Sequence, residues 1–123
     1  MILGIGIDIV HISRMSRWED DDALLRRFFH PDELEEARSK GRTVVQSLAA
    51  RFAAKEAYGK ALGTGLHALR LRDIRVSSNV NGKPDLVLYG SARDRFEQIG
   101  GKSAFVSLTH EHDNAIAVVV LEA

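Results

Sequence analysis

Small and apolar residues alternate at the start of the chain in a pattern that predicts a strand. Over residues 2–10, the isoleucines at positions 5, 7 and 9 fall on one face, and Gly4, Gly6, Asp8 and Val10 fall on the other. One face is therefore strongly apolar. The other carries two residues without side chains and one acid.

The rest of the chain contains both helical and extended patterns. The longest helix is predicted over residues 44–62, where alanine and leucine dominate, and Gly63 and Gly65 end it. Asn81-Gly82 is typical of a turn between two strands. Further helices are predicted over residues 13–18, 23–29, 31–39 and 91–99, the last capped by the serine at its first position, and strands over residues 73–80, 85–89, 104–109 and 115–121. This order predicts an α+β fold with a mostly antiparallel sheet, in one domain of residues 1–123.

Charge and composition exclude several classes of protein. The 17 basic and 17 acidic residues cancel, which argues against a broad surface for nucleic acid. The chain has no cysteine, so disulfides, thiolate metal sites and cysteine nucleophiles are excluded. Its apolar runs are shorter than the roughly 20 residues of a membrane span, and its first residues lack the basic segment of a signal peptide. We expect a soluble, cytoplasmic protein without a membrane partner.

Asp8 is unusual because it stands in the middle of an isoleucine-rich strand. A carboxylate buried there without a partner would cost free energy. One interpretation is an edge strand whose acid faces water, and the other is a metal ligand or a catalytic base. The two glycines on its face would let another backbone or a ligand approach closely.

Charged residues also interrupt the alanine-rich helix. Glu56 and Lys60 are spaced i,i+4, so an ordinary ion pair on a solvated helix face is one explanation. Glu56 also falls near the packed side of the helix, which favours a functional acid. Arg51 and Lys55 are like charges at the same spacing, and a bound anion would relieve their repulsion.

Polar residues gather at the end of a predicted strand, at Ser107-Leu108-Thr109-His110, before two acids and a second histidine. A Ser-His-Asp triad or a zinc site can be imagined here, but the nucleophile elbow and the HExxH spacing are both absent. Gly63-Thr64-Gly65 is a further candidate, for phosphate, although the C-terminal end of a helix disfavours anions.

Three segments together resemble a known family. GIGIDIV at 4–10, SLAARFAAKEAYGKALGTG at 47–65 and SLTH at 107–110 are similar to the holo-acyl-carrier-protein synthases, which are single-domain 4'-phosphopantetheinyl transferases of bacterial fatty acid synthesis. The resemblance runs from Ile2 to Leu121. Thr109 stands where the family commonly has a second serine, and Leu71 and Arg72 occupy a stretch that is often aromatic.

The resemblance implies a 4'-phosphopantetheinyl transferase-like fold and a reaction. Coenzyme A donates its 4'-phosphopantetheine arm to a serine of apo acyl carrier protein, and adenosine 3',5'-bisphosphate leaves. The family's magnesium-binding carboxylates match Asp8 and Glu56, and two carboxylates with waters suit this ion. Lys60 would neutralise a phosphate oxygen or assist the leaving group. Glu56 and a metal-bound water both stay open as the base.

The family is typically a homotrimer with coenzyme A in the clefts between subunits. By this resemblance, Asp8, Glu56 and Lys60 come from one chain. The other expected residues would come largely from the neighbouring chain: Arg51, Ser107, Thr109 and His110. The remaining expected contacts to coenzyme A are Gly63, Gly65, Asn81 and Pro84.

Basic residues of the first helix bind the strongly acidic carrier protein in the family. The resemblance therefore implies docking on a local basic patch, although four acids at positions 19–22 lie in the same stretch. The expected docking residues are Arg14, Arg17, Arg26 and Arg27, with Met15 and Phe28 or Phe29 as apolar anchors.

Two other functions use the same residues. A binding module would hold a nucleotide or an acidic partner without chemistry. A metal-dependent hydrolase would release phosphopantetheine from coenzyme A without a protein acceptor.

Overall fold

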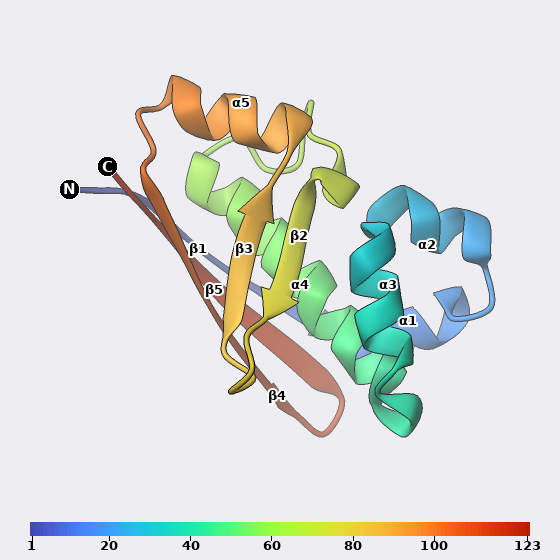
Figure 1. Ribbon diagram of the computed structural model, residues 1–123. Helices are drawn as coiled ribbons and strands as arrows, with labels where there is room; N and C mark the ends of the chain where they lie inside the picture. The colour runs from blue at the N-terminus through green and yellow to red at the C-terminus, as the bar shows by residue number, and fades with distance from the viewer.

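The computed structural model describes residues 1–123, which form five helices and five strands (Figure 1). In chain order these are β1 (Ile2–His11), α1 (Ile12–Trp18), α2 (Asp22–Phe28), α3 (Pro31–Arg38), α4 (Val44–Leu62), β2 (Ile74–Ser78), β3 (Pro84–Leu88), α5 (Gly90–Gln98), β4 (Ser103–Glu111) and β5 (Asn114–Glu122). There are also two short 3-10 turns: η1 (Gly41–Thr43) directly precedes α4, and η2 (Leu71–Asp73) directly precedes β2. The predicted α+β class is confirmed.

The strands form two sheets rather than one. The order β1-β5-β4 makes a three-stranded sheet, β2 and β3 make a separate hairpin, and every pairing is antiparallel. Helix α5 connects β3 to β4 and the two strands do not pair, so each of them is an edge strand. The predicted antiparallel pairing is confirmed, and it is divided between these two sheets.

Helix α4 occupies the centre of the molecule. One side lies along β1 and β5, and the other sides are covered by α1, α3 and β2 (Figure 1). Buried residues consequently run all round the helix from Leu48 to Leu62, and six of these 13 residues are alanines. Small side chains let all these elements approach the helix closely.

The closest approach is between α4 and β1. A Cβ atom at Gly6 would lie 1.9 Å from the carbonyl oxygen of Ala57, and one at Gly4 would lie 1.9 Å from that of Ala61. The two backbones are therefore in direct contact, which only glycine permits. The residues around this contact on β1 and on α4 are held at short distance from each other.

Two cations of α4 are neutralised inside the protein. Lys55 is fully buried, and its Nζ donates to Glu33 Oε1 at 2.7 Å, to the carbonyl of Leu71 at 3.0 Å and to the carbonyl of Ile74. Burial lowers the pKa of the Lys55 ammonium, and the charge of Glu33 opposes this effect. Arg51 pairs with Glu36 at 3.1 Å. A bound anion is therefore not needed to relieve the repulsion between Arg51 and Lys55.

Capping contacts explain most helix boundaries. Asp21 accepts from the backbone of Leu24 at 3.1 Å, and Gly63 ends α4 with a left-handed φ of 83°. Ser91 does not cap α5 as predicted. Its N–H and its hydroxyl both donate to the carboxylate of Asp73, at 3.1 and 2.9 Å, so a side chain from η2 holds the start of this helix.

The glycine contact predicts a large loss of stability in the variant Gly6→Ala. The added methyl group must push β1 away from α4, and overpacking of this kind typically costs about 1–3 kcal/mol, or more when backbone is struck. Gly63→Ala is the control, because a Cβ at that position meets no other atom. Its free energy of unfolding should fall by only about 1 kcal/mol, through backbone strain. Urea unfolding measures both; equal stabilities for Gly6→Ala and the wild type would contradict the packing argument.

Candidate functional site

Asp8 points from β1 toward α4, opposite the isoleucine face. Its side chain is 17% exposed, and Lys60 Nζ donates to its Oδ1 at 3.0 Å and to the carbonyl of Ile7 at 3.0 Å. Although β1 is an edge strand, the acid does not simply face water. Lys60 pairs with Asp8 and not with Glu56, so the ion pair expected within α4 is not formed. Lys60 can pair with Asp8 because the glycine contact holds β1 close to α4.

Glu56 shares this region with Asp8. Partial burial is the main cause that raises the pKa of the Glu56 carboxyl above its ordinary value, and the negative charge of Asp8 raises it further. The cations Arg14 and Lys60 oppose the shift. Glu56 takes part in none of the ion pairs or side-chain hydrogen bonds of the structure, so the repulsion between the two acids is only partly compensated.

The two carboxylates fit a hard divalent cation. A cation would relieve their mutual repulsion, and Asp8 and Glu56 supply the oxygen ligands that Mg²⁺ prefers. No group of three or more His, Asp or Glu side chains is placed to hold a metal ion. Such a cation would therefore need further oxygen ligands from water or from a phosphate, which is usual for Mg²⁺ and unusual for structural zinc. The zinc interpretation of the histidines has no support in the structure.

Arg14 of α1 lies at the border of this acidic pair. Its guanidinium stacks over the rings of Trp18, at 5.7 Å, and Phe52, at 5.3 Å, and its charge acts on Glu56. Of the expected docking residues, Arg14 is thus the one placed beside the acids. Sequence reasoning missed the two aromatic residues; the i,i+4 spacing of Arg14 and Trp18 is the signal that could have indicated one of them.

Arg51 and His110 lie in a different place. They line a hollow of about 330 Å³ together with Ser47 of α4 and Gly82 of the β2–β3 loop. Arg51 is only 4% exposed and donates to Ser47 Oγ, to the carbonyl of Val76 and to Glu36. Outside α4, the hydrogen-bond partners of Arg51 are on α3 and β2, whereas the charges that act on Glu56 are on β1 and α1. These two groups therefore occupy different sides of α4.

The residues at the end of β4 divide between the two faces of the sheet. Ser107 and Thr109 are exposed on the outer face with the isoleucines, opposite Val118 and Ile116 of β5, and His110 is on the inner face opposite Ala115. Side chains three positions apart on a strand point to opposite faces. A Ser107–His110 catalytic pair is therefore excluded, and the triad interpretation is wrong.

The glycines after α4 use their amides inside the protein. Gly63 N–H donates to the carbonyl of Lys60 at 3.0 Å and Gly65 N–H to that of Gly59 at 2.9 Å. Neither amide is free to hold a phosphate. A contact of Gly63 and Gly65 with coenzyme A, as predicted, would therefore have to use atoms other than their amide N–H groups.

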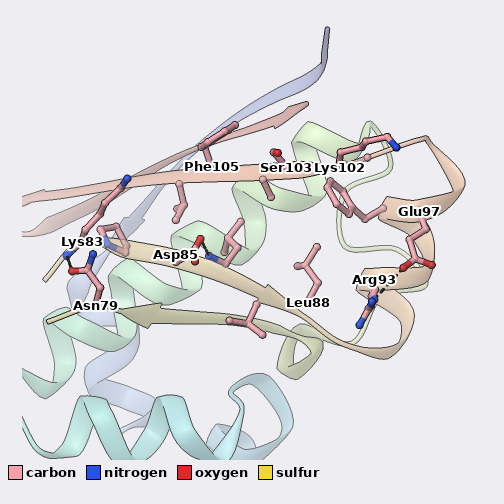
Figure 2. A pocket seen from close by; sticks show the side chains of 16 residues that line it. Asn79, Lys83, Asp85, Leu88, Arg93, Glu97, Lys102, Ser103 and Phe105 are labelled. Carbon is pink, nitrogen blue, oxygen red and sulfur yellow. Dashed lines mark hydrogen bonds and ion pairs between the residues drawn. The ribbon is translucent and has the colours of Figure 1, made fainter. Parts of the chain in front are cut away.

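The β2–β3 loop is organised by Asn79, whose Oδ1 accepts from the amides of Asn81, at 2.9 Å, and Lys83, at 3.0 Å. Gly82 faces the hollow of Arg51, and Pro84 faces a larger groove of about 790 Å³. Figure 2 shows this groove between β3 and β4, with Lys83 and Asn79 at one end and Arg93 and Glu97 at the other. Sequence reasoning missed it, because its walls are the edges of two separate sheets.

The expected docking surface needs one correction. Met15 and Phe29 are fully buried, so they cannot anchor a partner. Phe28 is half-buried and contacts Trp18, with ring centroids 5.2 Å apart, and Phe52, at 6.1 Å. The other three arginines, Arg17, Arg26 and Arg27, are exposed as expected.

Comparison with known proteins identifies the class to which this chain belongs. Residues 4–119 match the model of the 4'-phosphopantetheinyl transferase superfamily, and the chain is a member of that family. Within it, a holo-[acyl-carrier-protein] synthase of Treponema denticola is 52% identical over 99% of both chains.

Solved structures agree. The holo-[acyl-carrier-protein] synthase of Neisseria meningitidis has a TM-score of 0.90 at 37% identity and covers all of both chains. That of Helicobacter pylori, solved in complex with coenzyme A, has a TM-score of 0.83 at 33% identity over 96% of this chain and 99% of that one. The resemblance stated from the sequence is confirmed. No helix of the structure is long and apolar enough to cross a membrane.

The raised pKa of Glu56 predicts a pH-dependent cost to folding in the absence of metal. The folded state holds this proton more tightly than the unfolded state does. The stability of the metal-free protein therefore falls as pH rises from the ordinary pKa of a glutamate, about 4.3, through the raised value. Glu56→Gln should remove that fall and be more stable than the wild type at neutral pH, with the difference vanishing in acid.

Urea unfolding in the presence of a chelator at several pH values measures this effect. Asp94→Asn, at an exposed acid of α5, is the control. Added Mg²⁺ should then stabilise the wild type and leave Glu56→Gln almost unchanged. A Glu56→Gln variant that is less stable than the wild type without metal would contradict the site.

Proposed function

We propose that this chain is a holo-[acyl-carrier-protein] synthase. It transfers the 4'-phosphopantetheine arm of coenzyme A to a serine of apo acyl carrier protein. The serine oxygen forms a bond to the phosphorus that carries the pantetheine arm, the bond from that phosphorus to the bridging oxygen breaks, and adenosine 3',5'-bisphosphate leaves. The single observation that carries the proposal is the placement of Asp8, Glu56 and Lys60 at the contact of β1 with α4.

Asp8 and Glu56 would hold Mg²⁺. When bound, this ion neutralises the pyrophosphate of coenzyme A and the charge that develops on the leaving group. The support is the chemistry of the donors, which are two carboxylates whose mutual repulsion is only partly compensated. Each acid would otherwise repel the substrate, so both must be neutralised before a pyrophosphate can bind beside them.

Lys60 supplies a positive charge that can move. Its side chain is 52% exposed and reaches Asp8 from the last turn of α4. With Asp8 neutralised, the ammonium is able to turn to a phosphate oxygen and stabilise the leaving group. Glu56 is a candidate to accept the proton of the serine hydroxyl, because its carboxylate lies beside Asp8 and Lys60 in the proposed site.

The nucleotide half of the site is assigned to Arg51, Asn81, Pro84 and His110. Arg51 and His110 share one hollow, and the loop that contains Asn81 borders it, with Pro84 directly after this loop at the start of β3. Within one chain this half lies on another side of α4 from Glu56, because Arg51 contacts α3 and β2. A site completed by a second subunit accounts for the separation.

We therefore propose a homotrimer. The outer face of the three-stranded sheet is apolar and uncovered: Ile5, Ile7 and Ile9 are 62%, 58% and 58% exposed, and Phe105 is 53% exposed. Contiguous apolar surface of this kind marks an interface between proteins. Ser107 and Thr109 lie on the same face. If a neighbouring subunit covers this face, both residues would lie at the interface with that subunit.

Mass spectrometry of an apo carrier protein after incubation with coenzyme A and Mg²⁺ tests the function. The wild type should add the mass of phosphopantetheine to the carrier protein. Asp8→Ala or Glu56→Ala should lower kcat/KM by about 100-fold or more, as loss of a main electrostatic contact does. Asp94→Ala, which removes an exposed acid from α5, should have no effect.

The same assay separates the alternatives. A hydrolase would release phosphopantetheine without the carrier protein, and a binding module would leave both substrates unchanged. Mixing Asp8→Ala with His110→Ala subunits after dissociation and reassociation should restore part of the activity if the site is shared between chains. No recovery after verified subunit exchange would place both residues in the site of one chain.

A further inference from the structure

A hollow of about 400 Å³ lies between α2 and the η2 turn, outside the site described above. It is lined by three arginines and three apolar residues and by no acid: Arg27, Phe28, Leu69, Arg70, Leu71 and Arg72. The η2 turn directly precedes β2 and contacts α2. The chain as a whole has no net charge, so a hollow lined by three arginines and no acid is a local excess of positive charge.

The arginines of this hollow take part in no ion pair within the chain. The arginines that form ion pairs in the structure are Arg38, Arg51, Arg75 and Arg93. None of these four lines the hollow. Arg72 also lines a second hollow of about 600 Å³, beside Arg26 of α2. Four guanidinium groups, of Arg26, Arg27, Arg70 and Arg72, are therefore exposed and free to bind anionic groups of a partner.

The backbone below these side chains is firmly held. The buried Lys55 ammonium donates to the carbonyl of Leu71, and the amide of Arg70 donates to Ser91 Oγ at 3.1 Å. Asp73, at the end of the turn, holds the start of α5. A surface that is ordered before binding loses little conformational entropy when a partner docks.

The hollow is continuous with the acidic pair through aromatic rings. Arg27 stacks over Phe28 at 6.0 Å, Phe28 contacts Trp18, and Trp18 carries Arg14, whose charge acts on Glu56. Arginine and aromatic residues are the types enriched at the energetically important positions of protein interfaces. A partner that covers both ends of this row reaches Glu56 with one part of its surface and Arg72 with another.

We propose that Arg70 and Arg72 form a second contact region for the carrier protein, next to Arg27 of the expected docking surface and separate from Arg14. The inference rests on the proposed function, in which that protein brings its serine to Glu56. Unpaired cations around a small apolar hollow fit acidic side chains that flank an apolar one, as on an amphipathic acidic helix. The nucleotide is a poorer occupant, because the residues assigned to it border Arg51 on another side of α4.

The test is the double charge reversal Arg70→Glu/Arg72→Glu in the full protein. At low salt, KM for the carrier protein should rise about tenfold or more, because reversed rim charges slow association, while kcat and KM for coenzyme A stay within twofold. The difference from the wild type should shrink at high salt, where the Debye length falls below about 10 Å. Arg70→Lys/Arg72→Lys should retain most of the affinity.

Arg95→Glu is the matched control. This arginine is exposed on α5 and hydrogen-bonded only to Gln98, so its reversal makes half of the same change in net charge at another place. It should leave KM for the carrier protein within twofold. A tenfold rise with Arg95→Glu would show a general charge effect and overturn the inference. Equal thermal unfolding of all variants shows that the effect is on docking.

The outcomes separate this inference from the proposed function. If the wild type transfers no phosphopantetheine, the function itself is wrong. If the wild type transfers it and the double reversal keeps KM for the carrier protein within twofold, the function stands and the second contact region is overturned. A rise in KM for coenzyme A alone would assign the hollow to the nucleotide and would also overturn the inference.

Discussion

The contact of the β1 backbone with the α4 backbone is the constraint on which the rest of the structure depends. At Gly4 and Gly6 the strand touches the carbonyl oxygens of the helix, and no side chain fits between them. Because of this contact, Asp8, two residues further along the strand, lies within reach of Lys60 and acts on Glu56. The proposed site is thus built where a strand and a helix meet, on elements that cannot move apart without loss of the core.

Helix α4 uses its charged residues for two different tasks, according to the side on which they fall. Arg51 and Lys55 face α3, β2 and η2 and are neutralised by Glu36 and Glu33. Glu33 also accepts from the amide of Val76, so one buried carboxylate joins three elements. Removing one partner of such a buried pair typically costs about 3–5 kcal/mol. Glu56 and Lys60 face β1, where their charges are only partly balanced and remain available for a substrate.

Local patterns predicted the elements well, because caps and glycines act over a few residues. The bounds of α4 agree with the prediction, since an alanine-rich stretch is followed by a glycine in the left-handed conformation. The helices α2 and α3 begin within one residue of the predicted positions, at an aspartate cap and at Pro31. Asp8 and Glu56 were paired by the family resemblance alone, because periodicity does not relate a strand at the N-terminus to a helix near the middle of the chain.

Contacts between distant elements could not be predicted in the same way. The spacing of Glu56 and Lys60 favours a pair within the helix, but Lys60 bonds to Asp8, because the glycine contact places β1 closer. Met15 and Phe29 look like surface anchors in a basic stretch, yet they are core residues. The groove between β3 and β4 and the arginine hollow at η2 exist only because separate segments meet. Periodicity carries no information about such meetings.

The central claim is that the contact of β1 with α4 creates one cation site from Asp8 and Glu56. A crystal structure of the chain with coenzyme A and Mn²⁺, with the metal located by its anomalous signal, tests it most directly. The account predicts a metal peak bound by both carboxylates, with Lys60 turned from Asp8 toward a phosphate oxygen. A metal peak elsewhere, or coenzyme A bound with its pyrophosphate away from Asp8 and Glu56, would contradict it.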